Sequence, residues 1–204
     1  MITIVDYGMG NLGSVLNMFK KVGASAQISA DLETIAKAKK ILLPGVGAFD
    51  TAMEKINDTP GLKEVLDQKA LKEKVPVLGI CLGMQLLTNS SEEGGLNGLG
   101  WIPGKALHFK GRIDAALKIP HMGWNTASMQ KFNALNAGYE GEVRFYFVHS
   151  YFVQAAKPEN SLMKTNYGLD FDSALVQDNI FGAQFHPEKS HKFGMKLFEN
   201  FSKI

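Results

Sequence analysis

One cysteine stands in a setting that would make it a nucleophile. Cys81 is the only cysteine of the chain and lies in Gly79-Ile-Cys-Leu-Gly83, directly after an apolar run. A strand that runs through Gly-x-Cys-x-Gly into a helix is a nucleophile elbow, in which small neighbours leave room for a strained backbone. A helix that begins here would favour the thiolate through its dipole and leave the N–H of Leu82 free for an oxyanion. The pattern favours a catalytic cysteine over a buried structural one, the commonest state of a free thiol.

A thiol nucleophile needs a general base, and the five histidines differ in their surroundings. His186 ends an apolar segment and is followed by Pro187 and Glu188. Open α/β sheets place active sites at strand ends, and Glu188 would share a face with His186 if Pro187 keeps the segment extended. The carboxylate would then hold the imidazole in one tautomer, as the third member of a triad does. His149 also ends an apolar run but has no carboxylate beside it, which makes it the rival base.

Two glycine-rich segments follow short apolar runs and carry different expectations. Pro44-Gly-Val-Gly47 precedes a helical segment, so its backbone N–H groups would supply a second oxyanion donor. Gly8-Met-Gly-Asn-Leu-Gly13 fits the pattern of dinucleotide-binding turns, and Asp31 stands near the distance expected of a ribose-binding acid. A dinucleotide-dependent oxidoreductase would leave Cys81 and His186 unexplained. A thiol enzyme leaves only a glycine turn unexplained.

These side chains need a sheet edge to bring them together, and the first half of the chain predicts one. Short apolar runs alternate with segments of helical spacing, which indicates a parallel sheet with crossover helices. The expected elements of this half are Ile2–Val5, Leu12–Val22, Lys40–Leu43, Pro60–Glu73, Val75–Ile80 and Leu82–Asn89. After Gly98 we expect antiparallel or mixed strands and a closing amphipathic helix. These are Ala106–Lys110, Glu142–Ser150, Leu162–Asn166, Ile180–Phe185 and, for the helix, Lys192–Phe201.

Composition limits the class of protein. The 204 residues are 45% hydrophobic and no linker or repeat divides them, so a single domain over residues 1–204 is predicted. Lys and Arg number 22 against 20 for Asp and Glu, which disfavours nucleic acid and anionic membranes as partners. One unpaired cysteine, with no export or membrane-spanning signal, predicts a cytoplasmic protein.

The motifs together resemble the class I, triad-type glutamine amidotransferases. The resemblance runs from Asp6 almost to the C-terminus and rests on Pro44–Phe49, Gly79–Leu87, Pro120–Asn125, Tyr146–Tyr151 and Gln184–Ser190. The cysteine and His-Pro-Glu blocks are shared across that class. Pro120–Asn125 and Tyr146–Tyr151 resemble, more narrowly, the glutaminase subunits of imidazole glycerol phosphate synthases. The resemblance implies a flavodoxin-like α/β fold, with an open, mostly parallel central sheet flanked by helices and additional antiparallel strands in the second half.

The same resemblance implies a role for each site residue. Cys81 would attack the γ-amide carbon of L-glutamine, His186 would pass the proton to the leaving ammonia, and Glu188 would complete the triad. The oxyanion hole would be formed by the N–H groups of Val46 and Leu82. The residues that would grip glutamine or line its cleft are Gly47, Gln85, Glu93, His149, Ser150 and Tyr151.

A partner is implied as well. In this family ammonia passes to a (β/α)8-barrel synthase subunit, with which the glutaminase forms a heterodimer in histidine biosynthesis. Contacts to that barrel would fall on Asn11, Trp124, Tyr146 and Lys189. No metal and no organic cofactor is implied.

The sequence leaves several alternatives open. A paralogue with the same chemistry would serve another synthase, for example one that amidates a nucleotide sugar for surface polysaccharide. A stand-alone cysteine hydrolase or peptidase would use the same elbow without a partner, and a binding module would keep the fold without catalysis. In the plainest interpretation, Trp124 and Tyr146 are core aromatics and not partner contacts.

Overall fold

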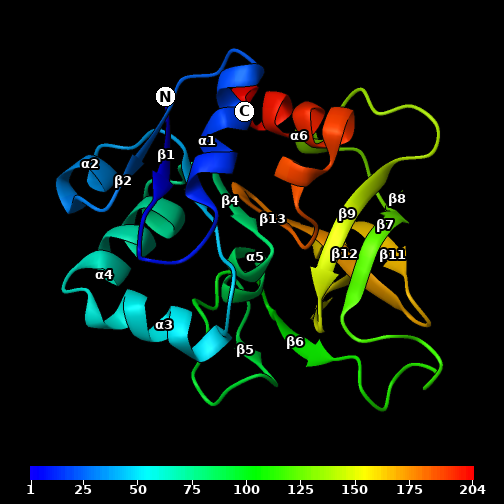
Figure 1. The fold of residues 1–204 in the computed structure, drawn as a ribbon. Helices are drawn as coiled ribbons and strands as arrows, with labels where there is room; N and C mark the ends of the chain where they lie inside the picture. The colour runs from blue at the N-terminus through cyan, green and yellow to red at the C-terminus, as the bar shows by residue number, and fades with distance from the viewer.

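The computed structural model describes residues 1–204 and has a large mixed sheet with helices on both faces (Figure 1). The elements of the first half are β1 (Ile2–Val5), α1 (Leu12–Lys21), β2 (Ala26–Ser29), α2 (Leu32–Ala36), β3 (Ile41–Leu43), α3 (Phe49–Asp58), α4 (Leu62–Asp67), the π-helical turn η1 (Gln68–Lys72), β4 (Val77–Ile80) and α5 (Leu82–Leu86). Those of the second half are β5 (Ser90–Ser91), β6 (Gly104–His108), β7 (His121–Thr126), β8 (Ser128–Met129), η2 (Ala134–Asn136), β9 (Arg144–His149), β10 (Tyr151–Ala155), η3 (Pro158–Asn160), β11 (Ser161–Asn166), β12 (Asp170–Gln177), β13 (Ile180–Ala183), η4 (Pro187–Lys189) and α6 (His191–Lys203).

The strand order explains how the two halves join. It is β2-β1-β3-β4-β13-β12-β10-β6-β5, with β11 and then β8 attached beside β12. The pairs from β2 to β13 are parallel, and those beyond are antiparallel except for the short β5–β6 pair. The α/β prediction, with a mostly parallel centre and antiparallel additions, is confirmed. Since β13 lies parallel to β4, the chain returns late to place the segment after β13 beside Cys81.

Two buried clusters cover the two faces of the parallel strands. Successive side chains on a strand point to opposite faces, so on β3 Leu42 joins one cluster while Ile41 and Leu43 join the other. Helices α1 and α6 cover the first face and meet through Phe19 and Phe198, whose ring centroids are 4.6 Å apart. Helices α2 to α5 cover the second face (Figure 1). The candidate site residues Cys81 and His186 lie between these layers, where the parallel strands β4 and β13 end.

A second, two-stranded sheet stands beside the main one. Strands β7 and β9 pair antiparallel, with His121 opposite His149 and Trp124 opposite Tyr146. Side chains alternate along β7: Met122 and Trp124 are exposed, whereas His121 is buried. One face of this small sheet therefore looks outward while the other belongs to the interior.

The sequence pattern predicted some elements and missed others. Strand β1 has the expected bounds and α1 ends one residue earlier than expected, whereas Pro60–Glu73 divides into α4 and the π-helical η1. Strand β2 was not predicted because none of its four side chains is fully buried, so it has no apolar run. None of the helices has the length and apolar character that crossing a bilayer requires.

Candidate active site

Cys81 occupies the turn between β4 and α5, in a strained backbone conformation. Its φ of 54° and ψ of −110° lie where L-residues are rarely found. The N–H of Cys81 donates to the carbonyl of Ala183 at 2.7 Å, which ties the turn to β13. As the first residue of α5, Leu82 has a backbone N–H without an intrahelical acceptor. The strand–cysteine–helix turn thus has the form that the glycine spacing predicts.

The two elbow glycines are required by close backbone contacts. A Cβ on Gly83 would lie 2.0 Å from the carbonyl oxygen of Leu43, and one on Gly79 would lie 2.6 Å from the carbonyl oxygen of Gly83. Both distances are far inside van der Waals contact. A side chain at either position would push α5 away from the strands and move Cys81.

We expect Gly83→Ala to lower the free energy of unfolding by about 1–3 kcal/mol, the usual penalty of overpacking, or by more if β3 cannot move. Gly13→Ala is the matched control, because Gly13 lies exposed in the first turn of α1 with nothing within 4 Å of its Cβ position. That change should be neutral or stabilise the fold by up to about 1 kcal/mol. Urea unfolding of the two variants measures both effects; equal stabilities would contradict the tight-elbow explanation.

His186 and Glu188 form a buried pair just after β13. Nδ1 of His186 lies 2.8 Å from Oε1 of Glu188, and each side chain is 3% exposed. The prediction of an extended segment is wrong: Pro187–Lys189 forms a 3₁₀ turn, which the fixed φ of proline permits at a first helical position. The hydroxyl of Ser190 donates to the carbonyl of His186 at 2.6 Å and closes the turn. The carboxylate therefore reaches the imidazole by curling back.

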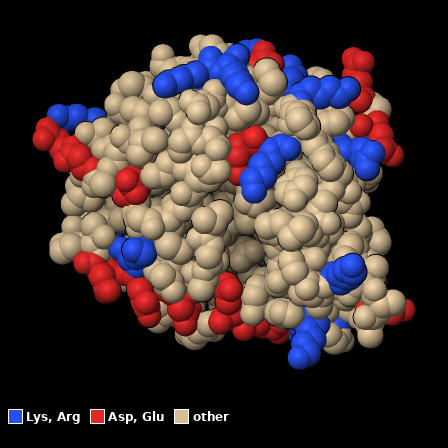
Figure 2. Space-filling view, in the orientation of Figure 1, with Lys and Arg blue, Asp and Glu red and all other residues tan.

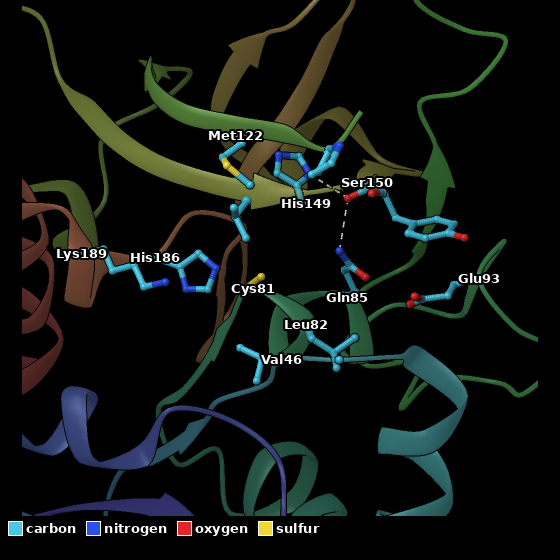
Figure 3. A pocket seen from close by; sticks show the side chains of 14 residues that line it. Val46, Cys81, Leu82, Gln85, Glu93, Met122, His149, Ser150, His186 and Lys189 are labelled. Carbon is cyan, nitrogen blue, oxygen red and sulfur yellow. Dashed lines mark hydrogen bonds between the residues drawn. The ribbon is translucent and has the colours of Figure 1, made fainter. Parts of the chain in front are cut away.

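The charge state of His186 follows from its neighbours. Burial opposes a positive charge on the ring, but its interactions with Cys81 and with the Glu188 carboxylate outweigh burial and raise the pKa of His186 to about 10. Nε2 of His186 has no hydrogen-bond partner and lies on the side of Cys81 (Figure 3). At neutral pH the imidazole is therefore cationic.

His149 does not act as a rival base in this arrangement, because both of its ring nitrogens are occupied. Nδ1 lies 2.8 Å from the carbonyl oxygen of Tyr151, and Nε2 lies 3.0 Å from Nδ1 of His121. Burial lowers the pKa of His149 to about 3, so the ring is neutral. His149 still lines the pocket, as the sequence predicts, but as part of its wall.

Cys81 opens into a cavity of about 350 Å³ at the sheet edge (Figure 3). Its lining includes every residue predicted to form the oxyanion hole or to bind substrate: Val46, Gly47, Leu82, Gln85, Glu93, His149, Ser150 and Tyr151. Cys81 and His186 also line it, while Glu188 lies behind the histidine, outside the cavity. Segments from β3, β4, β9 and η4 thus converge on one site. The individual roles of these residues stay predictions.

The glycine motif near the N-terminus packs against the Pro44–Gly47 loop. A Cβ on Gly10 would lie 2.9 Å from Cβ of Pro44, so the two loops are in direct contact. The buried hydroxyl of Tyr7 donates to the carbonyl of Pro44 at 2.5 Å. Asp31, the candidate ribose acid, instead caps α2 by accepting from the N–H of Thr34 at 2.8 Å. The dinucleotide interpretation is therefore unsupported.

Two glutamines connect Cys81 to the pocket wall, and sequence reasoning assigned no role to one of them. Nε2 of Gln184 lies 3.8 Å from Sγ of Cys81, and its Oε1 accepts from Nε2 of Gln85 at 3.2 Å. Gln85 also donates to the carbonyl of Tyr151 at 3.2 Å (Figure 3). The signal for Gln184 was its place two residues before His186, which puts both side chains at one edge of the sheet.

Glu93 and the loop around it are fixed by α3. Oε2 of Glu93 accepts from the N–H of Phe49 at 2.9 Å, and the carboxylate of Asp50 accepts from the N–H groups of Gly95 and Leu96. The loop after β5 is thereby held over the pocket. The carboxylate of Glu93 lies at the opposite end of the cavity from His186 (Figure 3).

Three of the predicted partner residues lie together, Trp124 and Tyr146 on the outer face of the small sheet and Lys189 on η4. Trp124 and Tyr146 meet edge to face with centroids 6.3 Å apart, and the ammonium of Lys189 lies 5.8 Å from the Tyr146 centroid. Trp124 is 39% exposed, which contradicts the view of it as a core aromatic. Sequence reasoning missed His191, whose ring stacks on Trp124 at 5.4 Å. Asn11 accepts from the N–H of Ser14 at the start of α1, the helix that packs beside η4.

Charges of both signs surround this face of the molecule. Acidic side chains gather along its lower edge, near α3, and lysines and arginines are scattered around the rim (Figure 2). One basic and one acidic side chain meet near the middle of the face, and below them the surface is uncharged and is hollowed where the pocket opens (Figure 2). No continuous basic area crosses the face seen in Figure 2.

Known proteins resemble this chain along its whole length. A family model described as glutamine amidotransferase class-I matches residues 3–204. The imidazole glycerol phosphate synthase subunit HisH 2 of Methanococcus maripaludis is 55% identical over 203 residues, covering 100% of this chain and 99% of the relative. The protein with that name from Pseudomonas aeruginosa is 49% identical over 204 residues, covering 100% of both. Subunit HisH of Bdellovibrio bacteriovorus is 48% identical over 205 residues, again covering 100% of both.

Solved structures agree on the fold. A crystal structure of a glutamine amidotransferase matches with a TM-score of 0.75 at 15% identity, covering 100% of both chains. PurLQS from Thermotoga maritima matches with a TM-score of 0.74 at 16% identity, covering 98% of this chain and 96% of that one. At such identities these likenesses concern the fold alone.

Proposed function

Because the chain belongs to the class I glutamine amidotransferases, we propose that it is the glutaminase subunit of an imidazole glycerol phosphate synthase. It hydrolyses L-glutamine to L-glutamate and ammonia, and the ammonia serves a synthase subunit that makes imidazole glycerol phosphate and AICAR in histidine biosynthesis. The observation that carries the proposal is the buried His186–Glu188 pair beside the strained Cys81, in a chain 42–55% identical over its full length to subunits of that name.

The chemistry proceeds through a thioester. The thiolate of Cys81 attacks the γ-carbonyl carbon of glutamine, and the oxyanion that forms is held by the N–H groups of Val46 and Leu82. His186, cationic at neutral pH, gives its Nε2 proton to the leaving nitrogen, and ammonia departs. The imidazole, now neutral, takes a proton from water as that water attacks the thioester. Glutamate leaves, and the thiolate–imidazolium pair returns.

The pocket suits the two ends of free glutamine. Gln85 directs its amide N–H groups into the protein, toward Tyr151 and Gln184, which leaves its carbonyl oxygen without a protein partner. Together with the Glu93 carboxylate it offers acceptors for the α-ammonium group and the γ-amide N–H groups of the substrate. Gly47, Ser150 and Tyr151 line the same cavity and complete the substrate site.

We assign the partner surface to the outer face of the β7–β9 sheet. A (β/α)8-barrel synthase subunit would dock on Trp124, Tyr146, Lys189 and Asn11, forming a heterodimer. The exposure of Trp124 and Met122 supports this, because exposed aromatic and methionine side chains are enriched at the centres of protein interfaces. The single free thiol is consistent with a cytoplasmic heterodimer.

The alternatives are less well supported. Relatives across the whole length of the chain have the imidazole glycerol phosphate synthase name, so a paralogue that amidates nucleotide sugars is not favoured. A self-sufficient hydrolase would leave the exposed Trp124–Tyr146–Lys189 cluster without a purpose.

The proposal is tested by glutamate release from glutamine, measured for the chain alone and with the barrel synthase of the same genome plus its nucleotide ligand. We expect strong stimulation by the barrel and no activity in Cys81→Ala. Glutaminase activity that the barrel does not change would assign the protein to another biosynthetic pathway. If no glutamate is released under any condition, the glutaminase assignment is wrong.

The docking surface is tested in the same assay. Trp124→Ala should weaken the complex about 30-fold or more, the effect of losing an aromatic hot spot. Phe132→Ala is the matched control, since Phe132 is 84% exposed and lines no part of the Cys81 cavity. Equal affinities for the barrel in the two variants would place the docking surface elsewhere.

A further inference from the structure

The interior face of the small sheet carries two histidines with no acidic neighbour. His121 on β7 and His149 on β9 are register partners, are 2% and 6% exposed, and are joined through Nδ1 of His121 and Nε2 of His149 at 3.0 Å. The ring of His121 is stacked on Phe147 at 4.8 Å and on Tyr167 at 4.1 Å, both at 25°. This histidine lies outside the Cys81 cavity, and the proposed mechanism does not use it.

The direction of every hydrogen bond in this chain of groups follows from its two ends. The carbonyl of Tyr151 only accepts, so Nδ1 of His149 carries the proton of the neutral ring. Nε2 of His149 is then the acceptor nitrogen, with a free lone pair. Nδ1 of His121 must therefore donate to Nε2 of His149, which makes Nε2 of His121 a second acceptor nitrogen.

At the far end, Asn125 supplies the last donor. Its Nδ2 lies 3.2 Å from Nε2 of His121 and donates to the carbonyl of Asn166 at 2.9 Å. Its Oδ1 accepts from the N–H of Thr126, which settles the orientation of the amide. Only one neutral arrangement satisfies all of these contacts: both histidines in the Nδ1–H tautomer.

Protonation would break this arrangement, because a charged ring has two donors and no acceptor. Burial lowers the pKa of His121 to about 4 and that of His149 to about 3. The titratable groups that face these rings are the other histidine in each case, His186 beside His149, and Tyr167 stacked on His121, and no carboxylate is among them. The chain of bonds is therefore intact at neutral pH.

This row of hydrogen bonds ends on the Tyr151 carbonyl, which also belongs to the substrate pocket. The oxygen of Tyr151 accepts from His149 on one side and from Gln85 on the other (Figure 3). Gln85 continues to Gln184, whose amide lies 3.8 Å from Sγ of Cys81. The wall formed by Ser150 and Tyr151 is thus anchored between the nucleophile and the buried histidines.

We propose that His121 is a positioning residue for glutamine binding: by donating to His149 it fixes the Tyr151 carbonyl and with it the β9–β10 wall of the pocket. Without this donor, Nε2 of His149 becomes a buried acceptor with no partner. The ring then turns to find one and releases the carbonyl. The inference deepens the proposed function and rests on it for the identity of the ligand.

Three substitutions separate the donor from the bulk of the ring. His121→Phe keeps an aromatic ring between Phe147 and Tyr167 but removes both nitrogens. His121→Asn places an amide N–H near the position of Nδ1, and His121→Gln places one near that of Nε2. We expect the Phe and Gln variants to bind glutamine about 10-fold more weakly, which is the loss of one buried hydrogen bond, and the Asn variant to regain most of that affinity.

Glutamine affinity is measured by calorimetry in the Cys81→Ala background, which removes turnover, and KM and kcat are measured in the complex with the barrel synthase. A rise in KM with kcat within about threefold is the result expected of a residue that acts through binding. Unchanged affinity and KM in His121→Phe would overturn the inference while leaving the glutaminase intact. If the parent chain itself binds no glutamine, the proposed function fails and the inference with it.

The tautomers provide an independent readout. Nitrogen-15 NMR of the histidine side chains at pH 7 should show two neutral rings protonated at Nδ1, and the His149 signal should change in His121→Phe and return toward its original position in His121→Asn. Either ring in the Nε2–H form, or charged, would overturn the inference whatever the kinetics.

Discussion

Cys81→Ser should lose at least about 10⁴-fold in kcat for glutamate release while the protein keeps its fold. A serine hydroxyl in this site is a far weaker nucleophile than a thiolate, because it has no appreciable anionic fraction at neutral pH. The change removes no packing volume of consequence, and the Cys81 N–H bond to Ala183 is a backbone contact that remains. Steady-state turnover in the barrel complex measures the loss, and calorimetry with glutamine shows whether the site is still formed.

The thioester provides a direct test of the same residue. With hydroxylamine present, the wild-type enzyme should divert part of the acyl group to γ-glutamyl hydroxamate, and Cys81→Ser should form none. Glutamate release by the wild type without any hydroxamate would point to direct attack by water, with Cys81 in another role. Substantial turnover by the serine variant would contradict the nucleophile assignment.

Glu188→Gln should lower kcat/KM by up to about 10⁴-fold, the loss seen when the third member of a triad loses its charge. The carboxylate accepts from His186 at 2.8 Å inside the protein, where its charge is little screened. Together with Cys81 it raises the pKa of His186 to about 10. Removing the charge should move that pKa down toward the ordinary histidine value of about 6.5.

The pH profile shows the sign of this effect. The leaving ammonia needs a protonated His186, so kcat/KM of the wild type should persist into alkaline solution and fall near pH 10. In Glu188→Gln the fall should come at a lower pH. Because the folded-state pKa lies above the unfolded value, the pair stabilises the fold fully below about pH 6.5, and this contribution is lost as the pH rises through about 10.

A surface carboxylate serves as the control for that profile. Glu199 on α6 pairs with Lys196 and Lys203, both at the surface, and its replacement by glutamine should leave the pH dependence of kcat/KM unchanged. Glu188→Asp keeps the charge but shortens the reach to His186, so it tests the geometry alone. An alkaline limb in Glu188→Gln at the wild-type position would show that Glu188 does not control the charge of His186.

Local signals in the sequence were reliable where the chemistry itself demands a local pattern. The strained conformation of Cys81 needs glycine on both sides, so the elbow was readable from five residues. The apolar run of β1 and the amphipathic spacing of α6 likewise follow from burial on a single element. Strand β2 and the 3₁₀ turn after His186 were missed because neighbours distant in sequence decide their conformation.

By itself, the sequence determined the α/β class, the family and the set of residues that chemistry would need, because these depend on residue type and short spacing. Only the tertiary structure decided which candidates meet and what each side chain contacts. Asp31 caps α2, Nε2 of His149 is hydrogen-bonded to His121, and Trp124 is exposed. The physical reason is that burial and hydrogen-bond partners are set by strand register between segments far apart in the chain, as in the pairing of β7 with β9 and of β4 with β13.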